Sequence, residues 1–111
     1  MMAGKFVLSK GKSGKYHFVL KAGNGETILS SQHYDAKVSA EGGIASVKVN
    51  APLDERYERK TATDGSRMFN LKAGNDQIIG TSEMYTSAAG RDNGIASVKT
   101  NAPGAVVVDT V

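Results

Sequence analysis

The stretch GIASVK-x-NAP occurs twice in this chain, from Gly43 to Pro52 and again from Gly94 to Pro103. Residues 5–52 and 56–103 align without a gap at an offset of 51 residues, and about 19 of the 48 aligned positions are identical. Two copies are too few for a solenoid, in which each repeat packs only against its neighbours. The pattern predicts instead two equivalent units that share one core about a pseudo-twofold axis.

Each unit carries three stretches typical of strands, followed by one stretch typical of a helix. Apolar residues at every second position, bounded by Gly, Ser and Asn, indicate strands. Apolar residues three and four positions apart, such as Ile44 and Val47, indicate a helix, and Gly43 and Gly94 indicate that its backbone lies close to the sheet. The predicted strands are residues 4–10, 15–21, 26–31, 53–61, 67–72, 77–82 and 105–109, and the predicted helices are 36–49 and 87–100.

These elements predict an α+β fold made of two tandem β-β-β-α repeats with pseudo-twofold symmetry. The strands form one antiparallel sheet with both helices on one face, and the strand after each helix is exchanged into the other repeat. We expect residues 1–111 to form a single domain, in which residues 4–52 are repeat one, 53–103 are repeat two and 104–111 are a closing strand.

The segment GKFVLSKGKSGKYHFVLKAGNGETILSS, together with Tyr34 and the two GIASVK-x-NAP copies, resembles the YegP-like family of small, mostly bacterial proteins of unknown function. The resemblance covers about residues 4–103. It implies a three-strands-then-helix unit, present as a tandem repeat or as a dimer of single units, with exchanged C-terminal strands. It implies no activity. Repeat two departs from the pattern at Glu58, Arg59, Asn70 and the Gly90-Arg91 pair.

The composition narrows the class of protein. The chain has no cysteine, so disulfides and cysteine-based metal sites are excluded. No apolar run reaches the roughly 18 residues that span a bilayer, so we expect a soluble cytoplasmic protein with no membrane contact. The first 52 residues carry a net charge of +4 and the remainder −1, which gives repeat one the basic surface. The internal pseudo-dimer predicts a monomer.

With both helices on one face of the sheet, the other face is open. Its repeat-one half is predicted to be apolar, with one histidine and with lysines at its rim, whereas the repeat-two half is mixed. An exposed apolar patch of this kind is typical of a surface that binds a partner protein. The predicted partner surface consists of Val7, Lys15, His17, Val19, Lys21, Thr27 and Leu29.

Two alternatives stay open. The first is nucleic-acid binding by the lysines of repeat one, with Tyr16 or His17 stacking on a base. These lysines are Lys5, Lys10, Lys12, Lys15 and Lys21. The second is an enzyme that uses His33, Tyr34 and Asp35 at the strand-to-helix corner. Repeat two has Met84 and Thr86 in place of the outer two residues, so it would have at most one such site. No spacing predicts a catalytic residue, a metal site or a cofactor.

Overall fold

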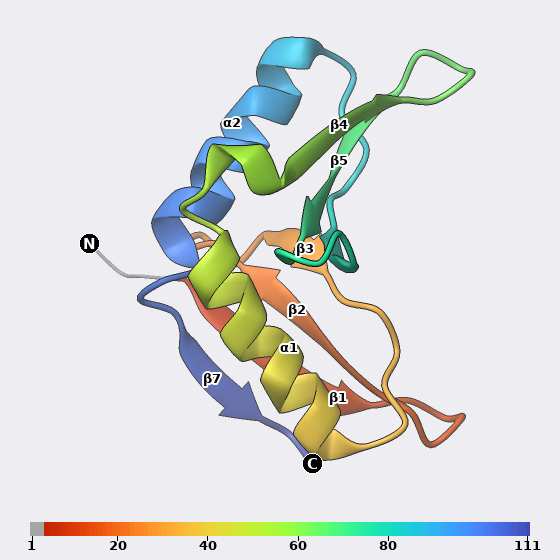
Figure 1. Ribbon diagram of the computed structural model, residues 1–111, viewed down its shortest axis with the longest axis vertical. Helices are drawn as coiled ribbons and strands as arrows, with labels where there is room; N and C mark the ends of the chain where they lie inside the picture. Colours follow the sequence, from red (N-terminus) through yellow and green to blue (C-terminus); the bar gives the residue numbers. More distant parts are fainter. Residues whose placement is uncertain (1–3) are drawn as a thin grey trace.

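The computed structural model describes residues 4–111, which form a seven-stranded sheet and two helices (Figure 1). The elements follow the predicted order in both repeats, with one short 3-10 turn between them. The elements of repeat one are β1 (Lys5–Lys10), β2 (Tyr16–Lys21), β3 (Thr27–Ser30) and α1 (Lys37–Asn50). The turn η1 (Asp54–Arg56) leads into β4 (Tyr57–Thr61), β5 (Arg67–Lys72), β6 (Ile78–Thr81) and α2 (Ala88–Asn101), and β7 (Val106–Asp109) closes the chain.

The sheet has the strand order β4-β5-β6-β3-β2-β1-β7, so each repeat supplies one half and the halves meet where β3 pairs with β6. The strand after each helix lies in the other repeat's half, as predicted: β4 pairs with β5, and β7 pairs with β1. The prediction of a purely antiparallel sheet is wrong for one pair, because β7 runs parallel to β1. The sheet is therefore mixed.

This difference comes from the two segments that follow the helices. At the repeat offset, β7 corresponds to η1 and the start of β4. The chain after α1 turns once through η1, which occupies the first part of the strand predicted over residues 53–61, and then becomes the first strand of repeat two. The chain after α2 instead extends along the outer edge of β1 as β7.

The core lies between the sheet and the two helices, which pack on the same face. Phe6, Leu8, Phe18 and Leu20 alternate along β1 and β2, and all four are fully buried. Each helix also crosses the junction between the repeats, since α1 packs on β6 and β5 as well as β2, and α2 packs on β3 as well as β5. In Figure 1, α1 lies in front of β1 and β2. One core therefore serves both repeats.

The repeated glycine in each helix allows a close approach, as the sequence predicts. A Cβ on Gly43 would lie 2.5 Å from the hydroxyl oxygen of Tyr34 and 3.0 Å from the Phe18 ring. In repeat two, a Cβ on Gly94 would lie 2.7 Å from Cζ of Tyr85 and closer still to its hydroxyl. The GIASVK-x-NAP stretch is thus a packing element that the pseudosymmetry requires twice.

Candidate functional site

A row of cross-strand partners runs over the open face of the sheet, across all seven strands. Side chains of paired residues point to the same face, so the row can be followed from the strand register alone. No described element covers this face. In order, the row is Val108, Val7, Val19, Ser30, Thr81, Asn70 and Glu58.

The repeat-one end of this row is apolar. Val7 and Val19 are half-buried, whereas Val108 and the neighbouring Val106 on β7 keep 39% and 63% of their surface exposed. Lys5 and Lys21 pair with each other one row further along. The strands of this half place no acidic residue on the open face, and within residues 4–111 neither lysine has a carboxylate at ion-pair distance. The result is an apolar strip with a basic border.

The repeat-two end of the row is a closed polar network. Buried Asn70 donates from Nδ2 to Glu58 Oε1 at 3.1 Å and accepts a hydrogen bond from Thr81 Oγ1 at 2.9 Å. Lys72 Nζ lies 3.1 Å from Glu58 Oε2. The hydrogen bonds from Asn70 and then from Lys72 hold the pKa of the Glu58 carboxyl below its ordinary value. These groups satisfy one another and leave little for a partner to bind.

Most of the predicted partner surface lies on the open face. The residues on that face are Val7, His17, Val19, Lys21 and Thr27, all of them half-buried. Lys15 lies in the loop before β2, where its Nζ is 3.3 Å from Asp35 Oδ1. The prediction for Leu29 is wrong, because this side chain is 1% exposed and lies on the helix face opposite Leu20. A register shift between Leu20 and Lys21 inverts the alternation that the prediction counted.

The two histidines lie together beside the open face. The rings of His17 and His33 meet edge to face with their centroids 5.4 Å apart, and His17 Nε2 lies 3.3 Å from Ser9 Oγ. His17 Nδ1 is buried and has no hydrogen-bond partner among residues 4–111. Within the same range, no three His, Cys, Asp or Glu side chains come together in a group that could hold a metal.

The proposed catalytic corner does not converge. His33 contacts His17 on the open face, whereas Tyr34 stacks on Phe18 under the helix, with ring centroids 6.3 Å apart. Burial raises the pKa of the Tyr34 hydroxyl, which disfavours its ionised form. Asp35 is 89% exposed at its side chain and pairs with Lys15. The three residues therefore point to different surroundings.

The lysines proposed for nucleic-acid binding divide into two groups. Lys5 and Lys21 lie at one end of the β1–β2 hairpin, and the remaining three lie at or near its loop, about five residues or roughly 17 Å away. Lys10 Nζ lies 5.4 Å from the ring centroid of Tyr16, and Tyr16 belongs to the helix face. Stacking by Tyr16 on the open face is thus excluded by the register.

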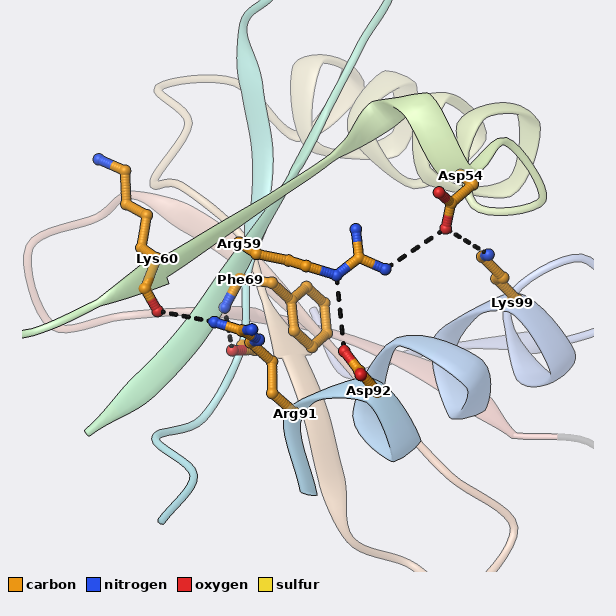
Figure 2. Close-up of polar contacts among 8 residues, drawn as sticks. Asp54, Arg59, Lys60, Phe69, Arg91, Asp92 and Lys99 are labelled. Atoms are coloured by element: carbon orange, nitrogen blue, oxygen red, sulfur yellow. Dashed lines mark hydrogen bonds and ion pairs between the residues drawn. The ribbon is translucent and has the colours of Figure 1, made fainter. Parts of the chain in front are cut away.

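Sequence reasoning noted Arg59 and Arg91 only as departures from the repeat and missed what they form. Arg59 contacts Asp92 in α2 and Arg91 contacts the Lys60 carbonyl in β4, on the opposite side of the sheet from the predicted surface (Figure 2). Arg67 donates to the Thr86 carbonyl, just before α2. The sequence feature that could have revealed this grouping is composition, since all four arginines of the chain lie between residues 56 and 91.

Within residues 4–111 no helix is long and apolar enough to cross a membrane.

Comparison with known proteins places the chain among proteins of unknown function. The model of a family described as "Domain of unknown function (DUF1508)" matches it twice, at residues 12–58 and 62–109. The UPF0339 protein YegP of Escherichia coli K12 is 59% identical over 97% of this chain and 98% of its own length, and a UPF0339 protein of Acinetobacter baylyi is 56% identical over 97% of each. The resemblance to the YegP-like family is therefore confirmed.

Two solution NMR structures have the same fold. The structure of yegP from E. coli, a protein of unknown function, matches with a TM-score of 0.94 and 58% identity and covers 99% of this chain and 95% of the other. The structure of UPF0339 protein SO3888 from Shewanella oneidensis matches with a TM-score of 0.92 and 50% identity, over 97% and 92% of the two chains.

Proposed function

Given that the chain belongs to the DUF1508 family, a domain of unknown function, we propose that it is a non-enzymatic, monomeric interaction module of the cytoplasm. Its ligand is an acidic segment of a partner protein, which binds the repeat-one half of the open sheet face. The observation that carries the proposal is the strip of Val108, Val7 and Val19, which crosses three strands beside the paired Lys5 and Lys21.

The chemistry of this strip favours a partner with alternating apolar and acidic side chains. Covering a valine removes apolar surface from water, which stabilises a complex by about 1 kcal/mol for a half-exposed side chain. Acidic groups on the partner would meet Lys5 and Lys21, which have no carboxylate partner within residues 4–111. A basic partner would instead face two uncompensated lysines, so charge supplies the selectivity.

The free edge of β7 fits an extended partner. Each of its four residues is exposed, and its sequence VVVD contains no basic residue or proline to discourage pairing. The other edge, β4, has the sequence YERKT, whose charges are typical of a protected edge. A strand added to β7 would align its side chains with the row of valines.

The proposal is tested by titrating the ¹⁵N-labelled full chain with two peptides of equal length, one alternating Val with Glu and the other alternating Val with Lys. We expect amide shifts on β7, β1 and β2 with the Glu peptide only. Changing Val19 and Val108 to Thr keeps β-branched side chains but removes apolar surface, and should weaken binding about tenfold. Ile78→Thr is the matched control, because Ile78 occupies the position of Thr27 in repeat two.

The two peptides and an oligonucleotide together distinguish a protein partner from a nucleic acid. No shifts with either peptide, or equal shifts with both, would refute the proposal. A short single-stranded oligonucleotide titrated at low salt tests the nucleic-acid alternative; saturable, salt-sensitive shifts on the same strands would replace a protein partner with a nucleic acid.

A further inference from the structure

The arginines of this chain are confined to repeat two. Repeat one has seven basic residues that are all lysine, whereas the seven of repeat two include four arginines. The two side chains are not interchangeable, because the planar guanidinium matches the geometry of phosphate and carboxylate groups through paired hydrogen bonds. A residue type with this preference collected in one half indicates a site rather than a general surface charge.

Three of these arginines make contacts at or beside the first turn of α2. Arg59 reaches from β4 towards α2, with its Nε 3.5 Å from Asp92 Oδ1, and Arg91 reaches back from α2 to donate to the Lys60 carbonyl at 3.3 Å (Figure 2). Arg67, at the start of β5, donates to the Thr86 carbonyl at 3.5 Å, just before the helix. We call Arg59, Arg67 and Arg91 the arginine cluster.

Repeat one has core residues in the same three places. Arg59, Arg67 and Arg91 correspond to Leu8, Tyr16 and Ala40. Leu8 and Ala40 are fully buried, and Tyr16 packs against the core. The same backbone positions thus support an apolar cluster, and packing does not require arginine there. Three guanidiniums in these places carry a desolvation cost that the apolar residues avoid.

Other groups of the protein accept hydrogen bonds from only a few of the N–H donors in this cluster. Each guanidinium has five N–H donors, yet Arg67 and Arg91 make one side-chain hydrogen bond each, and Arg91 Nε is buried without a partner within residues 4–111. Arg59 is the only member with a carboxylate at ion-pair distance in that range, and its contacts to Asp54 and Asp92 are both 3.5 Å long. Lys99 Nζ lies closer to Asp54 Oδ1 than Arg59 does, at 2.8 Å.

The charges indicate which kind of ligand the arginine cluster suits. With Asp54 engaged by Lys99, Arg59 pairs with Asp92, and neither Arg67 nor Arg91 has a carboxylate at ion-pair distance within residues 4–111, which leaves two positive charges. We propose that the arginine cluster binds the dianionic phosphate group of a small phosphorylated molecule. A phosphate monoester carries close to two negative charges at neutral pH and offers three oxygens to the free donors. A phosphodiester carries only one, so a nucleic-acid backbone fits less well.

The test uses the ¹⁵N-labelled full chain titrated with inorganic phosphate at constant ionic strength. We expect saturable shifts at the arginine Nε–Hε signals and at residues 86–92. Arg91→Ala introduces the residue of repeat one, so the fold should persist, and it should weaken binding at least tenfold. Lys12→Ala removes the same charge from the distant hairpin loop and should change affinity less than twofold. Arg59→Lys keeps the charge but loses the paired donors, so it should also weaken binding.

Two further measurements identify the charge state and the size of the anion that binds. Phosphate should bind more weakly at pH 5 than at pH 7, because its second ionisation lies near pH 6, whereas sulfate should bind alike at both. Equal affinity of wild type and Arg91→Ala, or equal losses in Arg91→Ala and Lys12→Ala, would overturn the site. Tighter binding of a short oligonucleotide than of a phosphate monoester such as glycerol 3-phosphate would overturn the assignment to a small ligand.

Discussion

Leu29 of repeat one and Gly80 of repeat two are equivalent positions beside the pseudo-twofold axis, yet only one side chain fits between them. A Cβ on Gly80 would lie 2.5 Å from Leu29 Cδ2 and 2.6 Å from its Cγ. Leu29 is 1% exposed, so it fills the space that two symmetric residues would compete for. The repeats must therefore differ at the axis, where each position packs against its own counterpart.

The repeats differ for another reason at the ends of the sheet. The outer edge of β1 is covered by β7, and Leu8 on the helix face of β1 is fully buried. The corresponding β4 is the last strand on its side, and its Arg59 side chain is 38% exposed. Identical positions are thus fixed by a core that both repeats share, whereas the unequal pair Leu8 and Arg59 follows from the single closing strand.

The largest expected effect is at the axis. Gly80→Leu would place two leucines in one space, and we expect the free energy of unfolding to fall by about 3 kcal/mol, at the upper end of overpacking costs. The exchange Leu29→Gly with Gly80→Leu returns one leucine to that space and should recover more than half of the loss. Urea denaturation followed by circular dichroism measures both.

The control for the axis is Leu29→Ala alone, which removes the side chain without replacing it. It should cost about 3 kcal/mol, as expected for a buried leucine. If the exchange variant were less stable than either single variant, Leu29 and Gly80 would not share one space, and the difference between the repeats would need another cause.

The second comparison concerns the glycines that the repeats share. Gly43→Ala and Gly94→Ala should each cost about 2 kcal/mol, because the clash with Tyr34 or Tyr85 exceeds the gain of roughly 1 kcal/mol in helix propensity. Combining each with Tyr→Phe at its partner should restore about half of the loss. Unequal costs in the two repeats, measured by urea denaturation, would show that this packing is not symmetric.

The repeat made most of the fold predictable from sequence. Nineteen identical positions at one offset place the strands and helices of both halves, and GIASVK-x-NAP locates the helix packing. The direction of β7 could not be predicted, because nothing in AVVVD distinguishes a parallel from an antiparallel neighbour. It depends on where α2 ends relative to β1, which is a property of the assembled core.

The candidate site was predictable only where the alternation is regular. Val7 and Val19 precede the bulge at Leu20 and Lys21, so counting by two gives the correct face; Leu29 follows it and does not. The arginine cluster joins residues from two strands and a helix, and their proximity follows from the register of β4 with β5. Sequence shows where the repeats differ, but only the fold brings those differences together.

The third prediction concerns the polar end of the open-face row. Asn70→Val introduces the residue found at position 19 and leaves Thr81 and Glu58 without a buried partner, so we expect a loss of about 1.5 kcal/mol at pH 7. The pKa of Glu58 is lowered in the folded state, chiefly by Asn70, so its contribution to stability is present above its unfolded pKa. That contribution is lost as pH falls through the lower folded pKa.

Wild type should therefore lose stability more steeply than Asn70→Val below about pH 4.5, which urea denaturation at several pH values detects. Glu58→Gln is the control, because it keeps an acceptor for Asn70 but cannot titrate, and it should flatten the acid dependence in the same way. Parallel pH profiles for wild type and Asn70→Val would contradict the network.

The smallest effect tests the two helix starts. Ser87 caps α2, with its Oγ accepting from Gly90 N at 3.0 Å, whereas Ala36 at the start of α1 has no side chain that can do so. Ser87→Ala should cost about 1 kcal/mol and Ala36→Ser should add about 0.5 kcal/mol, because the extended backbone at Ala36 already suits a cap.

The double variant Ala36→Ser with Ser87→Ala transfers the cap from repeat two to repeat one, so thermal denaturation should place it between wild type and Ser87→Ala. A neutral Ala36→Ser would instead mean that the start of α1 is already held by other contacts. The ion pair of Lys37 with Asp109, 2.6 Å long, connects the first residue of α1 to β7, and repeat two has Ala88 at the equivalent position. In that case Lys37→Ala should make α1 as dependent on its cap as α2 is.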